Sequence, residues 1–290
     1  MRRIFLFKLT TCLAAGLFLC AAPAAFAQAA GVNCKQVLNR MFSAINNVKT
    51  LRYNLYANER VNGKYNAANS EVKVNVSPFK AYYKYLKKGI EVLYVEGQEE
   101  NEAIVNPNGF PYFNLHLDPE GKLMRKGQHQ TIKRLGFSYT GTILQHAINQ
   151  FPDAYSKDIT YRGDTVCNGY PCYNIELNVP DFHYYTYMVE DTNETVSSIA
   201  SNLYLCDYLV LSANKFSSYE DALKKGQIIT IPNAYAKRTL MSISKNTYLP
   251  VYVKVYDDKG LLEEYSFSNI QVNCTIQDAE FTENYTGYHF

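Results

Sequence analysis

The sequence predicts an α+β protein: a curved, half-barrel-like antiparallel sheet packed on helices, with a small βααβ module inserted into it. Three observations predict this fold. Most of the chain alternates apolar and polar residues, which is the period of a half-buried strand. Two stretches, near 34–48 and 142–151, instead carry apolar residues at helical spacing. The 26 tyrosines, with no tryptophan, suit a sheet that has one wet face.

The first 27 residues are predicted to be a signal peptide. Arg2, Arg3 and Lys8 precede an apolar run over 12–22 that is too short to span a bilayer, and Ala25-Phe26-Ala27 is a cleavage signal. We therefore expect a periplasmic protein. No later stretch is apolar enough for a transmembrane span.

An outer-membrane lipoprotein is the less favoured alternative. Its lipidated residue would be Cys20, but Leu19 precedes it where a small residue is normal. Removing residues 1–27 takes away three basic and no acidic residues, so the formal net charge changes from +2 to −1. A near-neutral chain has little attraction for nucleic acid, so no nucleic-acid partner is expected.

The predicted elements of the host follow in order from residue 34. A helix over 34–48 carries the apolar stripe Leu38, Met41, Phe42, Ile45 and Val48. Strands are predicted at 51–55, 72–76 and 79–85 and within 91–97 and 102–107, before a turn-rich loop over 107–123. A second helix over 142–151 ends at Pro152, strands follow at 158–166 and 172–179, and a hairpin occupies 251–273.

A strand–helix–helix–strand unit interrupts these strands. Its first strand is Tyr185–Val189, Thr195 caps one helix, Cys206-Asp207 begins another, and the strand Ile228–Ile231 stops at Pro232. Two antiparallel strands would place its ends close together, as insertion into a host loop requires. The predicted domains are the signal peptide 1–27, a host of 28–182 with 235–290, and a module of 183–234.

The module resembles the LysM domain, a carbohydrate-binding module of cell-wall proteins. The sequence "SSIA" at 197–200, Asn214, and "LKKGQIITIP" at 223–232 stand at the family's spacing, while "NET" at 193–195 replaces the family's G-D-T. The resemblance implies a shallow groove for N-acetylglucosamine-containing glycans such as peptidoglycan. The residues it implies for glycan binding are Asn193, Glu194, Thr195, Val196, Leu223, Lys224, Gly226, Gln227 and Ile228.

The host resembles a family of exported Gram-negative proteins known as a domain of unknown function (number fifteen seventy-one). The segments "NERVNGKY", "SPFKAYYKY", "KGIEVLYVEGQEENEAIVNPN" and "LDPEGKLMRKGQHQTIKRLGF" carry this resemblance. That family is distantly similar to the half-barrel lipoprotein carriers of the periplasm. The resemblance implies a fold and a compartment rather than a function.

No constellation of residues indicates an enzyme, a metal site or a cofactor. The histidines show no pair at ligand spacing, no C-x-x-C occurs, and Glu263 and Glu264 should face opposite sides of a strand. A disulfide between Cys167 and Cys172, across the turn "NGYP", is a possible crosslink. Three further cysteines, Cys34, Cys206 and Cys274, are unassigned.

Two functions remain open. The leading hypothesis is an exported, non-enzymatic envelope protein that binds peptidoglycan through the module. The alternative is a periplasmic lipid or lipoprotein carrier that uses the concave apolar face of the sheet. In that case an apolar cavity would be lined by Tyr53, Leu55, Val72, Val74 and Tyr83, which otherwise pack as core. A solvated face, rather than a site for an acidic headgroup, is expected at Arg125, Lys126, Lys133 and Arg134.

Overall fold

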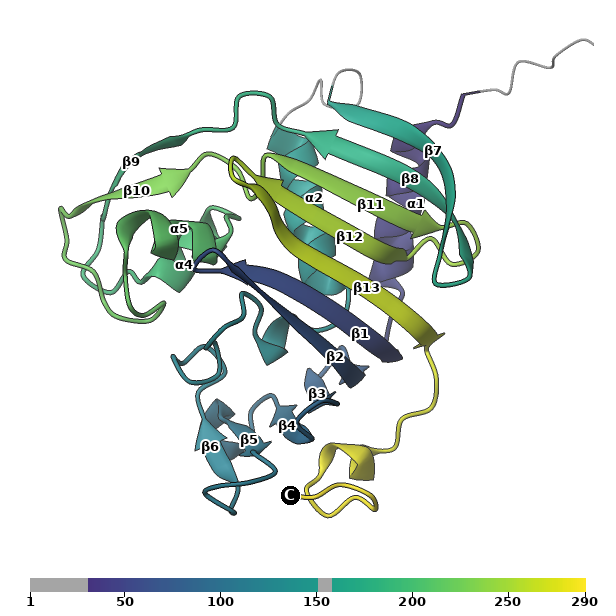
Figure 1. Ribbon diagram of the computed structural model, residues 1–290, viewed down its shortest axis with the longest axis vertical. Helices are drawn as coiled ribbons and strands as arrows, with labels where there is room; N and C mark the ends of the chain where they lie inside the picture. Colours follow the sequence, from purple (N-terminus) through teal and green to yellow (C-terminus); the bar gives the residue numbers. More distant parts are fainter. Residues whose placement is uncertain (1–30, 151–157) are drawn as a thin grey trace, which may run out of the picture. The chain divides into compact units, whose positions relative to one another are not determined.

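The computed structural model describes residues 31–150 and 158–290, and Figure 1 shows its ribbon. The predicted signal peptide with Cys20, and the predicted helix end at Phe151 and Pro152, lie outside these residues. Among the helices of the described residues, none has the length and apolar character to cross a membrane.

The predicted antiparallel sheet is confirmed. Within the described residues, eleven strands form one sheet in the order β6-β5-β4-β3-β2-β1-β13-β12-β11-β8-β7, and every neighbouring pair is antiparallel (Figure 1). The strands are β1 (Thr50–Val61), β2 (Lys64–Asn75), β3 (Lys80–Tyr85), β4 (Ile90–Val95), β5 (Ala103–Asn106), β6 (Leu115–Leu117), β7 (Ile159–Cys167), β8 (Tyr170–Asn178), β11 (Arg238–Ser244), β12 (Pro250–Asp257) and β13 (Gly260–Val272).

Two helices, α1 (Cys34–Asn46) and α2 (Ser138–Gln150), cover one face of this sheet (Figure 1). The predicted apolar stripe of α1 is buried in the main core, with Phe42 partly buried against it. Helix α2 begins four residues before its predicted start, because the Gly141 N–H already donates to the Phe137 carbonyl at 2.9 Å.

The predicted βααβ module is present as β9 (Tyr184–Met188), α4 (Val196–Asn202), α5 (Asp207–Asn214) and β10 (Ile228–Pro232). Strands β9 and β10 form a separate antiparallel pair. Thr195 caps α4 as predicted, since its Oγ1 accepts the Ser198 N–H at 3.1 Å. The module has an apolar cluster of its own, made of Val189, Val196, Ile199, Ala200, Leu205, Val210, Tyr219, Leu223, Ile229 and Ile231.

Leu209 belongs to α5 of the module but lies outside that cluster. It packs in the main core together with Cys206 and Tyr208. The first turn of α5 therefore packs against the main core of the host. Residues 32–290 form one compact unit, and the domain division at 183 and 234 stays a prediction.

The module enters and leaves the sheet at neighbouring strands. Asn178 at the end of β8 pairs directly with Arg238 at the start of β11. The sequence did not predict β11, whose Met241 and Ile243 are fully buried between β8 and β12. A pair of adjacent strand ends explains how the sheet admits an insertion without losing its register.

The C-terminal segment packs on the other face of the sheet. The ring of Tyr288 stacks on Tyr82 at 3.9 Å, beside the 3-10 turn η3 (Asp278–Phe281). Arg52 and Lys73 donate to the Glu280 carboxylate at 2.6 and 2.8 Å. Burial alone would raise the pKa of Glu280, but these hydrogen bonds outweigh it and lower that pKa to about 2.

Candidate functional site

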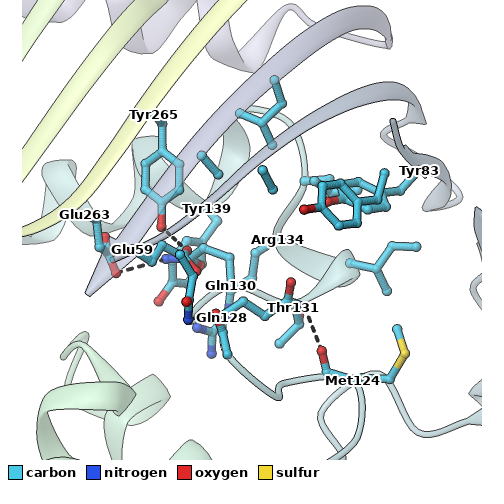
Figure 2. Close-up of a pocket in the computed structure, with 18 of the residues that line it drawn as sticks. Glu59, Tyr83, Met124, Gln128, Gln130, Thr131, Arg134, Tyr139, Glu263 and Tyr265 are labelled. Atoms are coloured by element: carbon cyan, nitrogen blue, oxygen red, sulfur yellow. Dashed lines mark hydrogen bonds between the residues drawn. The ribbon is translucent and has the colours of Figure 1, made fainter. Parts of the chain in front are cut away.

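A cavity of about 860 Å³ lies between the inner face of the sheet and the chain from Leu123 to Leu144 (Figure 2). Strand β1 contributes Tyr53, Leu55 and Ala57 to its wall, because alternate residues of a strand face the same side. Strands β2, β3, β4, β12 and β13 contribute further lining residues, and α2 contributes Tyr139, Thr140, Ile143 and Leu144.

Small side chains at the centre of the sheet leave this space open. Ala57 pairs with Ala68 of β2, and both line the cavity. Four residues earlier on β1, the larger side chain of Tyr53 pairs with Val72, stacks on Phe137 and also lines the cavity. The methyl groups of Ala57 and Ala68 therefore leave space that larger side chains would fill.

The segment over 121–136, which we call the covering segment, closes the cavity opposite the sheet. It contains the 3-10 turn η2 (Ile132–Arg134). The His129 N–H donates to Glu59 Oε2 at 2.7 Å and the Gly136 N–H donates to the Tyr53 hydroxyl at 2.9 Å. Both bonds tie the covering segment directly to β1.

One end of the cavity is polar, lined by Glu59, Tyr235, Glu263 and Tyr265, and buried His129 contacts Glu263 there. Glu59 of β1 stands directly opposite Glu263 of β13, and both are buried. His129 Nδ1 lies 2.9 Å from Glu263 Oε1, and the Tyr265 hydroxyl donates to Glu59 Oε1 at 2.6 Å. Figure 2 shows Glu59 and Glu263 at one end of the view and Tyr83 at the other.

The two charge signs offset one another at the polar end. Burial raises the pKa of Glu59. Burial alone would lower the pKa of His129, but the hydrogen bond and charge of Glu263 outweigh it and raise that pKa. The direction for His129 favours an imidazolium beside Glu263, whereas the direction for Glu59 favours its neutral acid form.

A second buried cluster, the guanidinium latch, joins the covering segment to the module. It consists of Arg125, Arg134, Asp207 and Tyr219. Asp207 Oδ2 accepts from Arg125 at 2.8 Å and from Arg134 at 2.7 Å. The Arg125 guanidinium also lies 3.5 Å above the centre of the Tyr219 ring. Burial would raise the pKa of Asp207, but the two guanidinium charges lower it, so the carboxylate is held ionised.

The structure separates the residues predicted for a carrier into two groups. Tyr53, Leu55 and Tyr83 line the cavity as expected. Val72 and Val74 do not, because they are fully buried in the main core against the helices.

The predicted solvated face is wrong for two of its four basic residues. Arg125 is buried and Arg134 is largely so, both on Asp207. Lys126 and Lys133 are exposed as expected.

The two loops predicted to form a sugar groove lie side by side. The Leu223 N–H donates to the Glu194 carbonyl at 2.8 Å. Exposed side chains or backbone are present at Asn193, Lys224, Gly226 and Ile228, the last of them 59% exposed.

Several of the predicted glycan residues instead hold the module together. Val196 is fully buried and Leu223 nearly so, because both belong to the module's apolar cluster, and the expected apolar contact from Val196 to a sugar is therefore corrected. The Glu194 carboxylate accepts the Glu190 N–H at 2.6 Å. The Thr195 hydroxyl caps α4, and Gln227 Oε1 accepts the Lys224 N–H at 3.2 Å.

Cys167 and Cys172 lie diagonally across the β7–β8 hairpin, since Cys172 pairs with Thr165. Both carry free thiols here, and the disulfide between them stays a prediction. Burial raises the pKa of Cys172 to about 11.

A family model matches residues 48–191. Its description is "Protein of unknown function (DUF1571)". This match supports the resemblance inferred from the host sequence, over the residues that it covers. A search of curated proteins finds no match.

Several solved structures are similar to this chain. They include MucB (11% identity, TM-score 0.43, covering 87% of this chain and 63% of that chain). They also include lipoprotein LppX of Mycobacterium tuberculosis (11% identity, TM-score 0.39, covering 84% and 100%) and a LolA superfamily protein from Nitrosomonas europaea (9% identity, TM-score 0.31, covering 88% and 100%). The chain thus spans less than two thirds of the MucB structure that it matches.

Proposed function

We propose that this protein is a non-enzymatic periplasmic carrier that holds the apolar part of a lipid-like molecule. The cavity is the observation that carries the proposal. Its volume of about 860 Å³ lies within the range of about 300–1,000 Å³ for small-molecule sites. Each buried methylene of a ligand contributes about 0.8 kcal/mol of transfer free energy. The apolar wall includes Leu55, Ile90, Val92, Val105, Leu117, Met124, Leu135, Ile143, Val253 and Val255.

The polar end supports a ligand with a hydrogen-bonding head group. Gln130 lines the cavity, and its Oε1 is buried with no hydrogen-bond partner. A buried acceptor without a partner costs about 1–3 kcal/mol, so a ligand hydroxyl or amide that donates to it recovers this free energy. The basic end of the signal peptide and its cleavage signal support export.

A cavity-filling substitution tests the proposal. Ala57→Phe places a ring in the cavity, while Asn58→Phe adds the same ring one residue later, on the opposite face of β1. We expect the delipidated protein to bind a fluorescent fatty acid, Ala57→Phe to bind it at least tenfold more weakly, and Asn58→Phe to stay within about twofold. Mass spectrometry of an organic extract should find lipid with the wild-type protein.

Equal affinities of Ala57→Phe and the wild type would reject the cavity as the binding site. Absence of both fatty-acid binding and co-purified lipid would reject the carrier function itself. Circular dichroism and urea unfolding of each variant establish that the comparison is between folded proteins.

The separate apolar cluster of the module and its adjacent loops support a second candidate function, glycan binding. Asn193, Lys224 and Ile228 would meet the sugar at the surface. Ile228→Glu should reduce pelleting with purified peptidoglycan at least fivefold. Val166→Glu changes a comparably exposed apolar residue on β7 and should leave pelleting unchanged. Equal pelleting of the two variants would exclude these loops as the glycan site.

A further inference from the structure

Three groups with metal-binding chemistry meet beside the polar end of the cavity. His129 lies in the covering segment, Cys206 directly precedes α5, and Glu263 lies on β13. One ligand atom of each lies within 4.8 Å of the others, and all three residues are buried. These positions lie far apart in the sequence, so ligand spacing along the chain does not reveal them.

The separations between these atoms are close to those of a tetrahedral zinc site. Zinc–ligand lengths of about 2.0–2.1 Å for nitrogen and oxygen and about 2.3 Å for sulfur give N···O of about 3.3 Å and S···O of about 3.5 Å. The structure has His129 Nδ1 at 2.9 Å and Cys206 Sγ at 3.9 Å from Glu263 Oε1. Each differs from the zinc geometry by about 0.4 Å, which a small side-chain rotation provides.

The histidine is oriented as a metal ligand. Its Nε2 lies 3.1 Å from the Arg60 carbonyl, and a carbonyl can only accept, so Nε2 carries a proton. Nδ1 is thereby the atom that faces Glu263 and Cys206. A second ring nitrogen that donates to a backbone carbonyl is the usual support of a metal-bound histidine. The ring also stacks on Tyr208 at 4.0 Å, which fixes its plane.

The electrostatics at this point favour a cation. Glu59 and Glu263 stand opposite one another on adjacent strands, where like charges destabilise a sheet. Among the described residues next to them, His129 is the ion-pair partner of Glu263. Two buried carboxyl groups thus lie beside one imidazole.

We propose that His129 Nδ1, the Cys206 thiolate and the Glu263 carboxylate bind one Zn²⁺. The fourth position is filled from the cavity, which Glu263 lines. On binding, the thiol proton and the proton between Nδ1 and Glu263 leave to solvent. The ion joins the sheet, the covering segment and the module at one point. This inference does not depend on which molecule the cavity holds.

The test uses the full mature chain, stripped by chelator in urea and refolded with zinc, so that a closed covering segment cannot hide the site. We expect about one zinc per chain after gel filtration. Cobalt in its place should give a thiolate-to-metal charge-transfer band. Cys206→Ser and His129→Gln should bind at least tenfold more weakly, whereas Cys172→Ser, which changes another buried thiol, should bind as the wild type does.

A wild-type chain that keeps no zinc overturns the proposal, as does a Cys206→Ser variant that binds zinc like the wild type. If Cys206→Ser fails to fold, the cobalt band in wild type and in Cys172→Ser decides, and its absence rejects a thiolate ligand. Fatty-acid binding is measured separately on the zinc-free chain, so the metal result and the carrier result stand or fall independently.

Discussion

Replacing Asp207 by alanine should destabilise the attachment of the module to the covering segment. The Asp207 side chain is 2% exposed and accepts from Arg125 and Arg134, and the Arg125 side chain is itself 1% exposed. Alanine would leave two buried guanidinium groups without this counter-charge. Removing one partner of a buried ion pair costs about 3–5 kcal/mol, against about 5–15 kcal/mol for the stability of a typical protein.

Urea unfolding of the mature chain measures this cost, and hydrogen exchange locates it. We expect exchange to increase first in α5 and in the covering segment, because the latch connects them. The matched control is Asp164→Ala, which removes an exposed partner of Lys245 and should cost at most about 1 kcal/mol. The triple change Arg125→Met, Arg134→Met and Asp207→Leu should be less harmful than Asp207→Ala, because it removes all three charges of the latch together. A loss for Asp207→Ala no larger than that for Asp164→Ala would refute the reasoning.

Three further predictions concern other parts of the chain. The pKa of Glu280 is lower in the folded protein, so its contribution to stability is present above the unfolded value of about 4.5 and disappears as pH falls through about 2. Glu280→Gln should therefore make the stability measured by urea unfolding fall less steeply with decreasing pH. An unchanged slope would contradict this. Asn214→Ala should cost about 1–3 kcal/mol in urea unfolding, since the Asn214 side chain both donates to and accepts from the Thr230 backbone; a loss below about 0.5 kcal/mol would argue against it. Peptide mapping of non-reduced protein should find Cys167 joined to Cys172 by a disulfide. Full reaction of both thiols with an alkylating reagent would contradict this.

The sequence predicts strands and helices correctly where one face of the element is buried, because burial of one face produces a regular spacing of apolar residues. Strand β1 shows this, since Leu51, Tyr53 and Leu55 face inward in sequence and in structure. Strand β11 was not predicted, because its inward-facing residues follow directly after the module, where the sequence indicates a connecting segment back to the sheet. Val196 was placed at the surface because resemblance identifies a loop but not which side chains in it are buried.

The polar end could not be predicted from local sequence pattern, because its residues are contributed by β1, β13 and two separate loops. One signal was nevertheless available. Glu59 and Glu263 stand at inward positions of their strands, in step with Ala57 and Tyr265. A carboxylate at such a position is costly unless partners satisfy it, so the strand parity alone predicts a buried polar cluster.

The attachment of the module to adjacent antiparallel strands determines how the protein responds to mechanical force. A pull on the module relative to the sheet reaches the sheet at the Asn178–Arg238 end of the β8–β11 ladder. Because both connections leave from this one end, such a pull loads the two strands together and does not separate one from the other. The packing of Leu209 and the bonds of Asp207 lie away from the ladder and link the module to the host independently. A force on the module is therefore shared between the two backbone connections and a few buried side chains that lie away from them.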